Sequence, residues 1–301
     1  MARISGRMAV SLVSAFAVSV SALAQPVVVV HDFGEAPREE IRYRFTADAT
    51  ETATMSMRMQ MSMGGQQAPG MAMPAINMPM TLRTTEIRAD GTARYEFESS
   101  AASIAGGSGA NPALEQALAS SLGQLGDMSG WYRIDSRGNI LESSYALPTG
   151  VPAPMAAQMG QVLNEMQAQM QQIAAPFPAE ALGIGARWQV SSTAVMMGTP
   201  IAMSMGYTLL ARDGDTVELG LEVVETVTAP AAALPGVPPA AQATMGAMEA
   251  SGTGKMTIDL NRMVARSEMT TTTAMSMAMP TSGQGQNMAM SMQMTMTITP
   301  D

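Results

Sequence analysis

Apolar residues alternate with polar ones over long stretches of this chain, beginning at residue 41. The apolar positions of the first stretch are Ile41, Tyr43, Phe45, Ala47, Ala49, Ala53, Met55, Met57, Met59, Met61 and Met63. Because successive side chains of a strand point to opposite faces of a sheet, this period of two predicts a long strand with one apolar face. Glu51 is the one break in that face.

The same alternation returns in four later stretches, most of them rich in methionine. They cover residues 76–82, 201–209, 275–279 and 288–298. Clean alternation is typical of antiparallel sheets that have one covered face and one face in water. The sequence therefore predicts a large antiparallel sheet.

Turn signals lie between these stretches, where antiparallel strands need them. Asp90-Gly91 and Asp213-Gly214 each separate two apolar-alternating segments. Asp-Gly takes the positive φ angles of tight hairpin turns at little steric cost. Pro280 to Asn287 is a polar, glycine-rich loop that we expect to join the last two methionine strands.

Three segments have helical patterns. Asn111-Pro112 resembles a helix start, and leucines follow it at helical spacing. A longer helix is predicted from Pro154 to the residue before Pro176, with Met155, Met159 and Met166 on its apolar stripe. Pro239 to Ala250 is a third and shorter candidate.

The chain also repeats itself. Ile134-Asp135 recurs as Ile258-Asp259, and Asp90-Gly91 recurs as Asp213-Gly214, at offsets of 124 and 123 residues. We predict a mainly β fold with a few helices (α+β). Its curved antiparallel sheet consists of two duplicated strand–hairpin–helix–hairpin units, and the helices cover the apolar, methionine-rich face. The predicted segments are a signal peptide (1–24), a linker (25–40), a first β-rich repeat (41–150), a bridging helix and linker (151–186) and a second β-rich repeat (187–301).

This arrangement resembles the lipoprotein carriers of bacterial envelopes (the LolA/LolB type), which are incomplete β-barrels with helices in their concavity. The resemblance rests on the alternating strands, the hairpins at Ile134-Asp135 and Ile258-Asp259, and the helices between hairpins. It also extends to secreted bacterial families without an assigned activity. It is architectural, so it implies an envelope location and an apolar cargo only as expectations.

Residues 1–24 have the three parts of a secretory signal peptide. Arg3 and Arg7 are followed by an apolar run and by the small-x-small site Ala22-Leu23-Ala24. We expect cleavage after Ala24 and a periplasmic or secreted protein. The apolar run is too short to span a bilayer, and there is no cysteine for a lipid anchor, so no stable membrane anchor is expected.

Charge and residue types argue against several function classes. The net charge is −9, and it becomes more negative once Arg3 and Arg7 are removed, which disfavours nucleic-acid binding. The only histidine is His31, in the predicted linker, and catalytic triads and zinc sites need a histidine held on a rigid element. Asp135 and Asp259 precede turns, where aspartate binds local backbone. We therefore predict a protein that is not an enzyme.

Methionine is the unusual feature, with 33 residues in 301. Methionine normally fills gaps in cores, and methionine-rich surfaces can repack around varied apolar partners. Its thioether is also a soft ligand that suits Cu(I). Exposed methionine can further be oxidised to the sulfoxide and repaired, so an oxidant sink is a possible role.

Three hypotheses follow. The first is a non-enzymatic protein that binds a lipid, an acyl chain or a hydrophobic peptide through Met55, Met57, Met59, Met61, Met155, Met159, Met166, Met203, Met205, Met290, Met292 and Met294. The second is a Cu(I) or Ag(I) site formed by Met55, Met57, Met59, Met275, Met277 and Met292. The third is a structural envelope protein without a ligand, in which the methionines are core.

Overall fold

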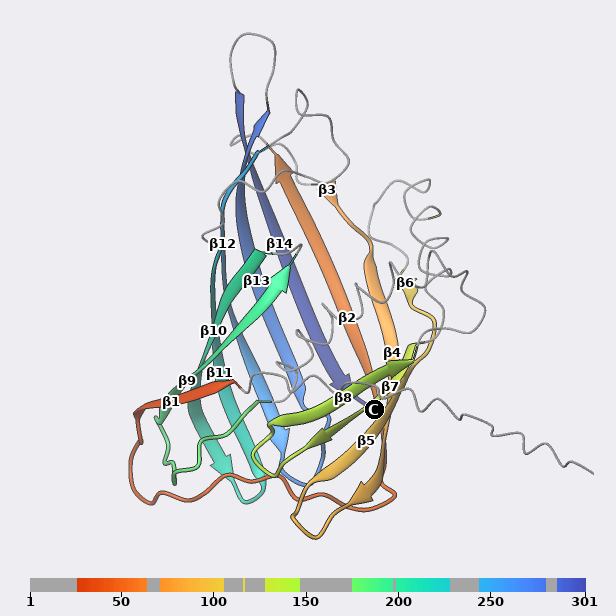
Figure 1. Ribbon diagram of the computed structural model, residues 1–301, viewed down its shortest axis with the longest axis vertical. Helices are drawn as coiled ribbons and strands as arrows, with labels where there is room; N and C mark the ends of the chain where they lie inside the picture. The colour runs from red at the N-terminus through yellow and green to blue at the C-terminus, as the bar shows by residue number, and fades with distance from the viewer. Residues whose placement is uncertain are drawn as a thin grey trace, which may run out of the picture.

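The computed structural model describes residues 26–63, 71–105, 116, 128–146, 175–196, 199–227, 244–279 and 286–301 (Figure 1). Within them the chain forms one open antiparallel sheet of fourteen strands, which confirms the predicted mainly β fold. The strands are β1 Val27–Asp32, β2 Thr50–Met63, β3 Met71–Ala72, β4 Ala75–Ile87, β5 Ala93–Ser99, β6 Ser103–Ala105, β7 Met128–Ile134, β8 Ile140–Ala146, β9 Arg187–Met196, β10 Thr199–Asp213, β11 Thr216–Val227, β12 Thr244–Asp259, β13 Arg266–Met279 and β14 Gln286–Pro300.

The strand order divides into two series with the same connectivity. One series is β1-β9-β10-β11-β12-β13, and the other is β14-β2-β4-β5-β7-β8, with β13 paired to β14 between them. Each series begins with a strand from the opposite end of the chain. The N-terminal β1 leads the series formed by the C-terminal half, and the C-terminal β14 leads the series formed by the N-terminal half.

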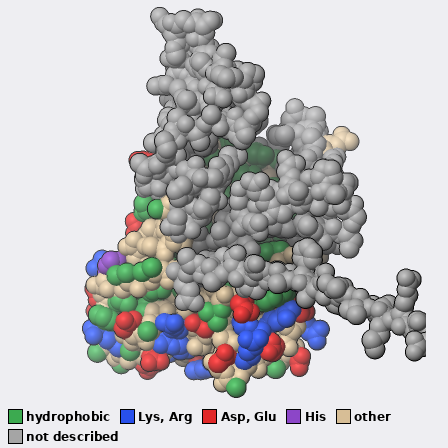
Figure 2. Space-filling model, viewed as in Figure 1, with side chains coloured by type: hydrophobic (Ala, Val, Ile, Leu, Met, Phe, Trp, Pro, Cys, Tyr) green, Lys and Arg blue, Asp and Glu red, His purple; other side chains and the backbone are tan. Residues whose placement is uncertain are grey.

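The sheet curves across its width, so that β9–β11 and β4–β8 stand on opposite sides of a common concavity (Figure 1). At one end, which we call the base, lie the hairpin turns that follow β4, β7, β10 and β12. Charged side chains of both signs gather over this lower part of the molecule (Figure 2). The outer surface of the base is therefore polar and solvated (Figure 2).

The hairpin turns at the base have the predicted chemistry. Gly91 and Gly214 have φ angles of 80° and 55°, values that favour glycine. The Asp135 carboxylate accepts hydrogen bonds from the backbone N–H groups of Arg137 and Asn139, and the Asp259 carboxylate accepts one from that of Asn261. Both aspartates thus close local turns, as expected.

Residues 41–49 differ from the prediction, since β2 begins only at Thr50. The preceding segment instead crosses the base inside the curve. The Tyr43 N–H donates to the Ser136 carbonyl and the Arg44 N–H to the Leu260 carbonyl, both at 2.7 Å. These donors bond to hairpin turns of both series rather than to a neighbouring strand. Ile41, Tyr43 and Phe45 therefore pack into the core without extending the sheet, while Ala47 is exposed.

Nine of the twelve aromatic residues form one continuous set of ring contacts across the base, with neighbouring centroids 5.3–6.5 Å apart. Such spacings suit stacked and edge-to-face ring pairs. In order of contact they are Tyr207, Trp188, Phe177, Tyr43, Phe45, Tyr95, Tyr132, Phe97 and Tyr145. This aromatic chain, as we call it, connects two buried cores, one around Trp188 and Leu219 and one around Ile134 and Tyr95.

The described part of the chain contains no complete helix, although Gln116, within the first expected helix, is helical. The helices expected after Asn111-Pro112 and over 154–175 lie outside the described residues, apart from residues 116 and 175. The third expected helix is wrong over residues 244–250, because β12 begins at Thr244. Met245 pairs with Met277 and Met248 with Met275, with a bulge between the two pairs. A bulge absorbs one residue, so a spacing of three that imitates a helix can stay in register with a spacing of two.

Candidate functional site

Methionines of β2 and β14 oppose one another directly along the middle of the sheet. Met57 pairs with Met296, Met59 with Met294 and Met61 with Met292. Side chains at directly opposed positions of antiparallel strands have Cβ atoms about 4.5–5.5 Å apart. The pairing of β2 with β14 thus places their methionines side by side, as a double row of thioethers.

The strands on either side extend this double row. On β4, Met78 pairs with Met55 and Met80 with Ala53, while on β13 Met269 pairs with Met296. We define the methionine face as the partly exposed methionines of β2, β4, β13 and β14 on this side of the sheet. Its members are Met55, Met57, Met59, Met61, Met78, Met80, Met269, Met290, Met292, Met294 and Met296.

The methionine face lies on the concave side of the sheet. The cross-strand row that contains Met57 continues through Met296, Met269, Gly254, Leu221, Tyr207 and Trp188. Tyr207 and Trp188 are buried in the core near the base. Since one row of cross-strand neighbours shares a face, the methionines line the same concavity that the aromatic chain fills below them.

The remaining predicted ligand-binding residues occupy other positions. Met203 and Met205 lie on β10, separated from β14 by three strands, and Met205 packs against the core around Trp188. Both are partly exposed on the opposite wall of the concavity. Met155, Met159 and Met166 lie outside the described residues. The structure therefore brings together only the β2 and β14 members of the predicted set.

The six predicted metal ligands are spread along the strands. Met55 pairs with Ile298, nearer the base, whereas Met275 and Met277 pair with Met290 and Met288 towards the other end. Met292 pairs with Met61, one step beyond Met59. The six predicted ligands are therefore too widely separated along the strands to form one group. The direct cross-strand partners of Met57 and Met59 are instead Met296 and Met294.

Glu51, the break in the apolar alternation, has a structural role at the lower edge of the methionine face. Its carboxylate accepts hydrogen bonds from the backbone N–H groups of Met263 at 2.8 Å and Val264 at 3.1 Å. Arg262 lies 3.5 Å from the same carboxylate. The charge is thus satisfied by the β12–β13 turn and does not face the methionines as a free ligand.

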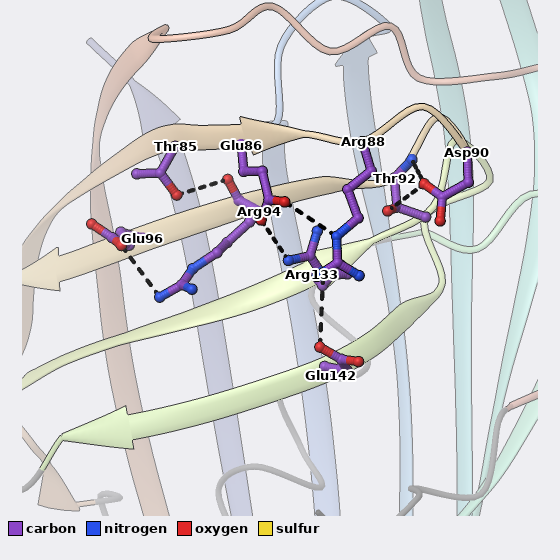
Figure 3. Close-up of polar contacts among 9 residues, drawn as sticks. All are labelled: Thr85, Glu86, Arg88, Asp90, Thr92, Arg94, Glu96, Arg133 and Glu142. Atoms are coloured by element: carbon purple, nitrogen blue, oxygen red, sulfur yellow. Dashed lines mark hydrogen bonds and ion pairs between the residues drawn. The ribbon is translucent and has the colours of Figure 1, made fainter.

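The most developed polar cluster lies on the outer face of β4, β5, β7 and β8 (Figure 3). A bulge between Thr84 and Glu86 places Glu86 opposite Arg94, on the outer side. Arg133, with only 5% of its side chain exposed, pairs with Glu86 at 2.8 Å and with Glu142 at 3.6 Å. The hydrogen bond from Arg133, followed by that from Arg88, holds the pKa of the Glu86 carboxyl below its usual range. These charges neutralise one another, so the cluster functions as structural support for the outer face.

His31 lies within β1, a strand at the edge of the sheet, and not in a linker as expected. Its Nε2 is 3.1 Å from Oε1 of Gln189, whose Nε2 lies 2.6 Å from Oγ of Ser204. These residues border a shallow outer groove of about 680 Å³ that includes Gly206 and Gly220. The sequence does not predict this groove, because isolated glycines in strands carry no local signal that they leave a hollow.

The described residues contain no group of three or more His, Asp or Glu that could hold a metal ion. Nor does the described part of the chain include a helix long and apolar enough to span a membrane. No protein-family model matches the sequence, and the comparison with curated proteins found no match.

Proposed function

We propose that this protein binds an apolar ligand, such as a lipid, an acyl chain or a hydrophobic peptide, on the methionine face. The observation that carries the proposal is the continuous double row of methionines on β2 and β14, which line the concave side and stay partly exposed. The expected signal peptide makes the periplasm or the extracellular space the proposed setting.

A contrast within the concave face supports this function. Near the base, Leu219 and Ile258 are 0% exposed, as expected of a close-packed core. Farther from the base on β2 and β14, the residues of the same face are methionines that retain exposed surface, whereas Val223 on β11 and Ala250 on β12 stay buried. Methionine is unbranched and adaptable, so it tolerates partners of varied shape better than a rigid aliphatic core would. The two parts of the face thus suit different tasks, namely stability at the base and binding above it.

We propose a role in binding rather than in catalysis. The single histidine, His31, lies on β1 at the edge of the sheet. Its side chain contacts Gln189 on the outer face, away from the methionines. Glu51, the acidic residue at the end of the methionine face, is occupied by two backbone N–H groups and Arg262. The methionine face therefore offers apolar surface and thioether sulfur as its chemistry.

The test is titration of the purified mature protein with a fluorescent long-chain fatty acid. Met59→Gln with Met294→Gln makes one opposed pair polar at nearly constant volume. We expect binding to weaken by about tenfold or more, the equivalent of losing part of two apolar contacts. The matched control is Gln60→Thr with Gln293→Thr, an opposed pair one residue away on the outer face, which should leave binding unchanged.

Equal binding by the methionine variant and the control would contradict the proposal. So would the absence of fatty-acid binding by the unmodified protein together with a bare polypeptide mass in native mass spectrometry. That second result would favour the structural hypothesis, in which the methionines serve only as packing.

A further inference from the structure

We infer that Met57, Met59, Met294 and Met296 form a site for a soft monovalent cation, Cu(I) or Ag(I). The inference uses the methionine face but does not require that this face bind an apolar ligand. The sequence pattern predicted six methionine ligands for such an ion. The strand register instead places these four methionines together.

The register provides the geometry. Met57 opposes Met296 and Met59 opposes Met294, so two directly opposed pairs follow each other on one face. Opposed Cβ atoms are about 4.5–5.5 Å apart, and residues two apart on one strand are about 7 Å apart. The four side chains therefore start from the corners of a small rectangle. The three rotatable bonds of methionine let the sulfurs turn towards its centre.

The chemistry of the four groups selects the ion. Thioethers are soft, neutral ligands that favour Cu(I) over hard cations such as Mg²⁺ or Ca²⁺. Their neighbours on the face include the thioethers of Met55, Met61, Met269 and Met292, together with Ile76 opposite Met57 and the hydroxyl of Thr271 opposite Met294. Thioether is thus the most frequent group around the four side chains. The intervening residues Arg58 and Thr295 belong to the outer face by strand alternation. A monovalent soft ion would thus meet sulfur ligands without a nearby free carboxylate on the described part of the face.

Burial is also suitable for a metal site. All four methionines are partly buried and partly exposed. Partial burial keeps water from competing freely with the weak thioether ligands, while partial exposure leaves a route for the ion to enter.

The experiment titrates the full mature protein with Ag(I) alone, and with Cu(I) in competition with a colorimetric Cu(I) chelator. Met59→Leu with Met294→Leu removes two sulfurs and keeps the face apolar. Since loss of an outer-sphere partner already costs metal sites on the order of 10–100-fold in affinity, loss of two direct ligands should cost at least as much. Met78→Leu with Met80→Leu, on β4 of the same face, is the matched control and should retain the affinity.

Two further readouts keep the inference testable if a variant folds poorly. X-ray absorption of the loaded, unmodified protein should show only sulfur ligands, and nitrogen or oxygen ligands would overturn the inference. Thioethers do not take up protons, so affinity should persist below the histidine pKa of about 6.5. Loss of binding there, or equal weakening in the β4 control, would also overturn it.

The leucine variants separate this inference from the proposed function. Leucine removes sulfur but preserves apolar surface, so the Met59→Leu, Met294→Leu protein should lose the soft ion and still bind the fatty acid. If this variant bound Ag(I) as tightly as the unmodified protein and bound the fatty acid more weakly, the metal-site inference would be wrong and the proposed apolar binding would stand.

Discussion

At the residue scale, Glu51 shows how one departure from a sequence pattern reveals a tertiary contact. Strand alternation places Glu51 on the apolar side of β2, where an unpaired charge would be costly. Its carboxylate accepts two backbone hydrogen bonds from the β12–β13 turn, two strands away, and its side chain is only 10% exposed. Glu51 therefore connects the start of β2 to the far side of β14.

Glu51→Ala should lower the free energy of unfolding by on the order of 2–3 kcal/mol, because it leaves two partly buried N–H groups without their acceptor. Glu51→Gln keeps one acceptor oxygen and should have a smaller effect. Urea unfolding at neutral pH measures both changes. Glu218→Ala, at an exposed position of β11, is the control and should shift stability by no more than about 0.5 kcal/mol. Equal midpoints for Glu51→Ala and the control would contradict this role.

At the element scale, β14 is the strand on which the two series depend. It pairs with β13 on one side and β2 on the other, so its backbone groups are shared between the halves of the chain. The two tryptophans report on different series, since Trp131 lies in β7 and Trp188 in β9. Fluorescence of single-tryptophan variants can therefore follow each series separately.

Gln293→Pro should destabilise both series together. Gln293 pairs with Gln60 and Thr272, and proline there removes a ladder hydrogen bond from an interior strand. The expected cost is about 3 kcal/mol or more. Unfolding curves recorded from Trp131 alone and from Trp188 alone should shift by the same amount. Gln293→Thr is the control, and a shift confined to one tryptophan would show that β14 does not couple the series.

At the scale of the whole molecule, the aromatic chain holds the two walls of the curved sheet together. It runs from Tyr207 on β10 through the base-crossing segments to Tyr145 on β8. All five tyrosines of the protein belong to it. Burial is the main cause that raises the pKa of every one of them, to about 12 for Tyr95 and higher for the others.

This predicts a delayed and cooperative alkaline transition. A raised folded-state pKa favours the neutral phenol, so the stabilisation is complete below the unfolded value of about 10 and is lost as pH rises through the folded values. We expect little tyrosinate absorbance in the folded protein near pH 10, and then joint ionisation and unfolding at higher pH. The urea-unfolded chain is the reference and should titrate near 10. A gradual folded-state titration near 10 would contradict the burial of these rings.

Much of the local structure could be predicted from the sequence because its causes are local. A period of two forces the methionines of β2 and β14 onto one face, and the Asp-Gly turns fix the β4–β5 and β10–β11 hairpins. The same local reasoning failed at residues 244–250, because a β-bulge allows a spacing of three on a strand. It also failed at residues 41–49, because an extended segment does not reveal whether its backbone partners are strands or turns.

The sequence by itself thus determined which residues share a face and where the tight turns lie. It also determined that thioether is the main functional group along the methionine strands. Only the tertiary structure decided the strand order within the predicted sheet, in which β1 pairs with the C-terminal half and β14 with the N-terminal half, and that Met57 and Met59 oppose Met296 and Met294. The reason is physical. Side-chain direction along a strand follows from backbone geometry, whereas pairing and register depend on the combined burial of segments more than 200 residues apart in the sequence, such as β2 and β14.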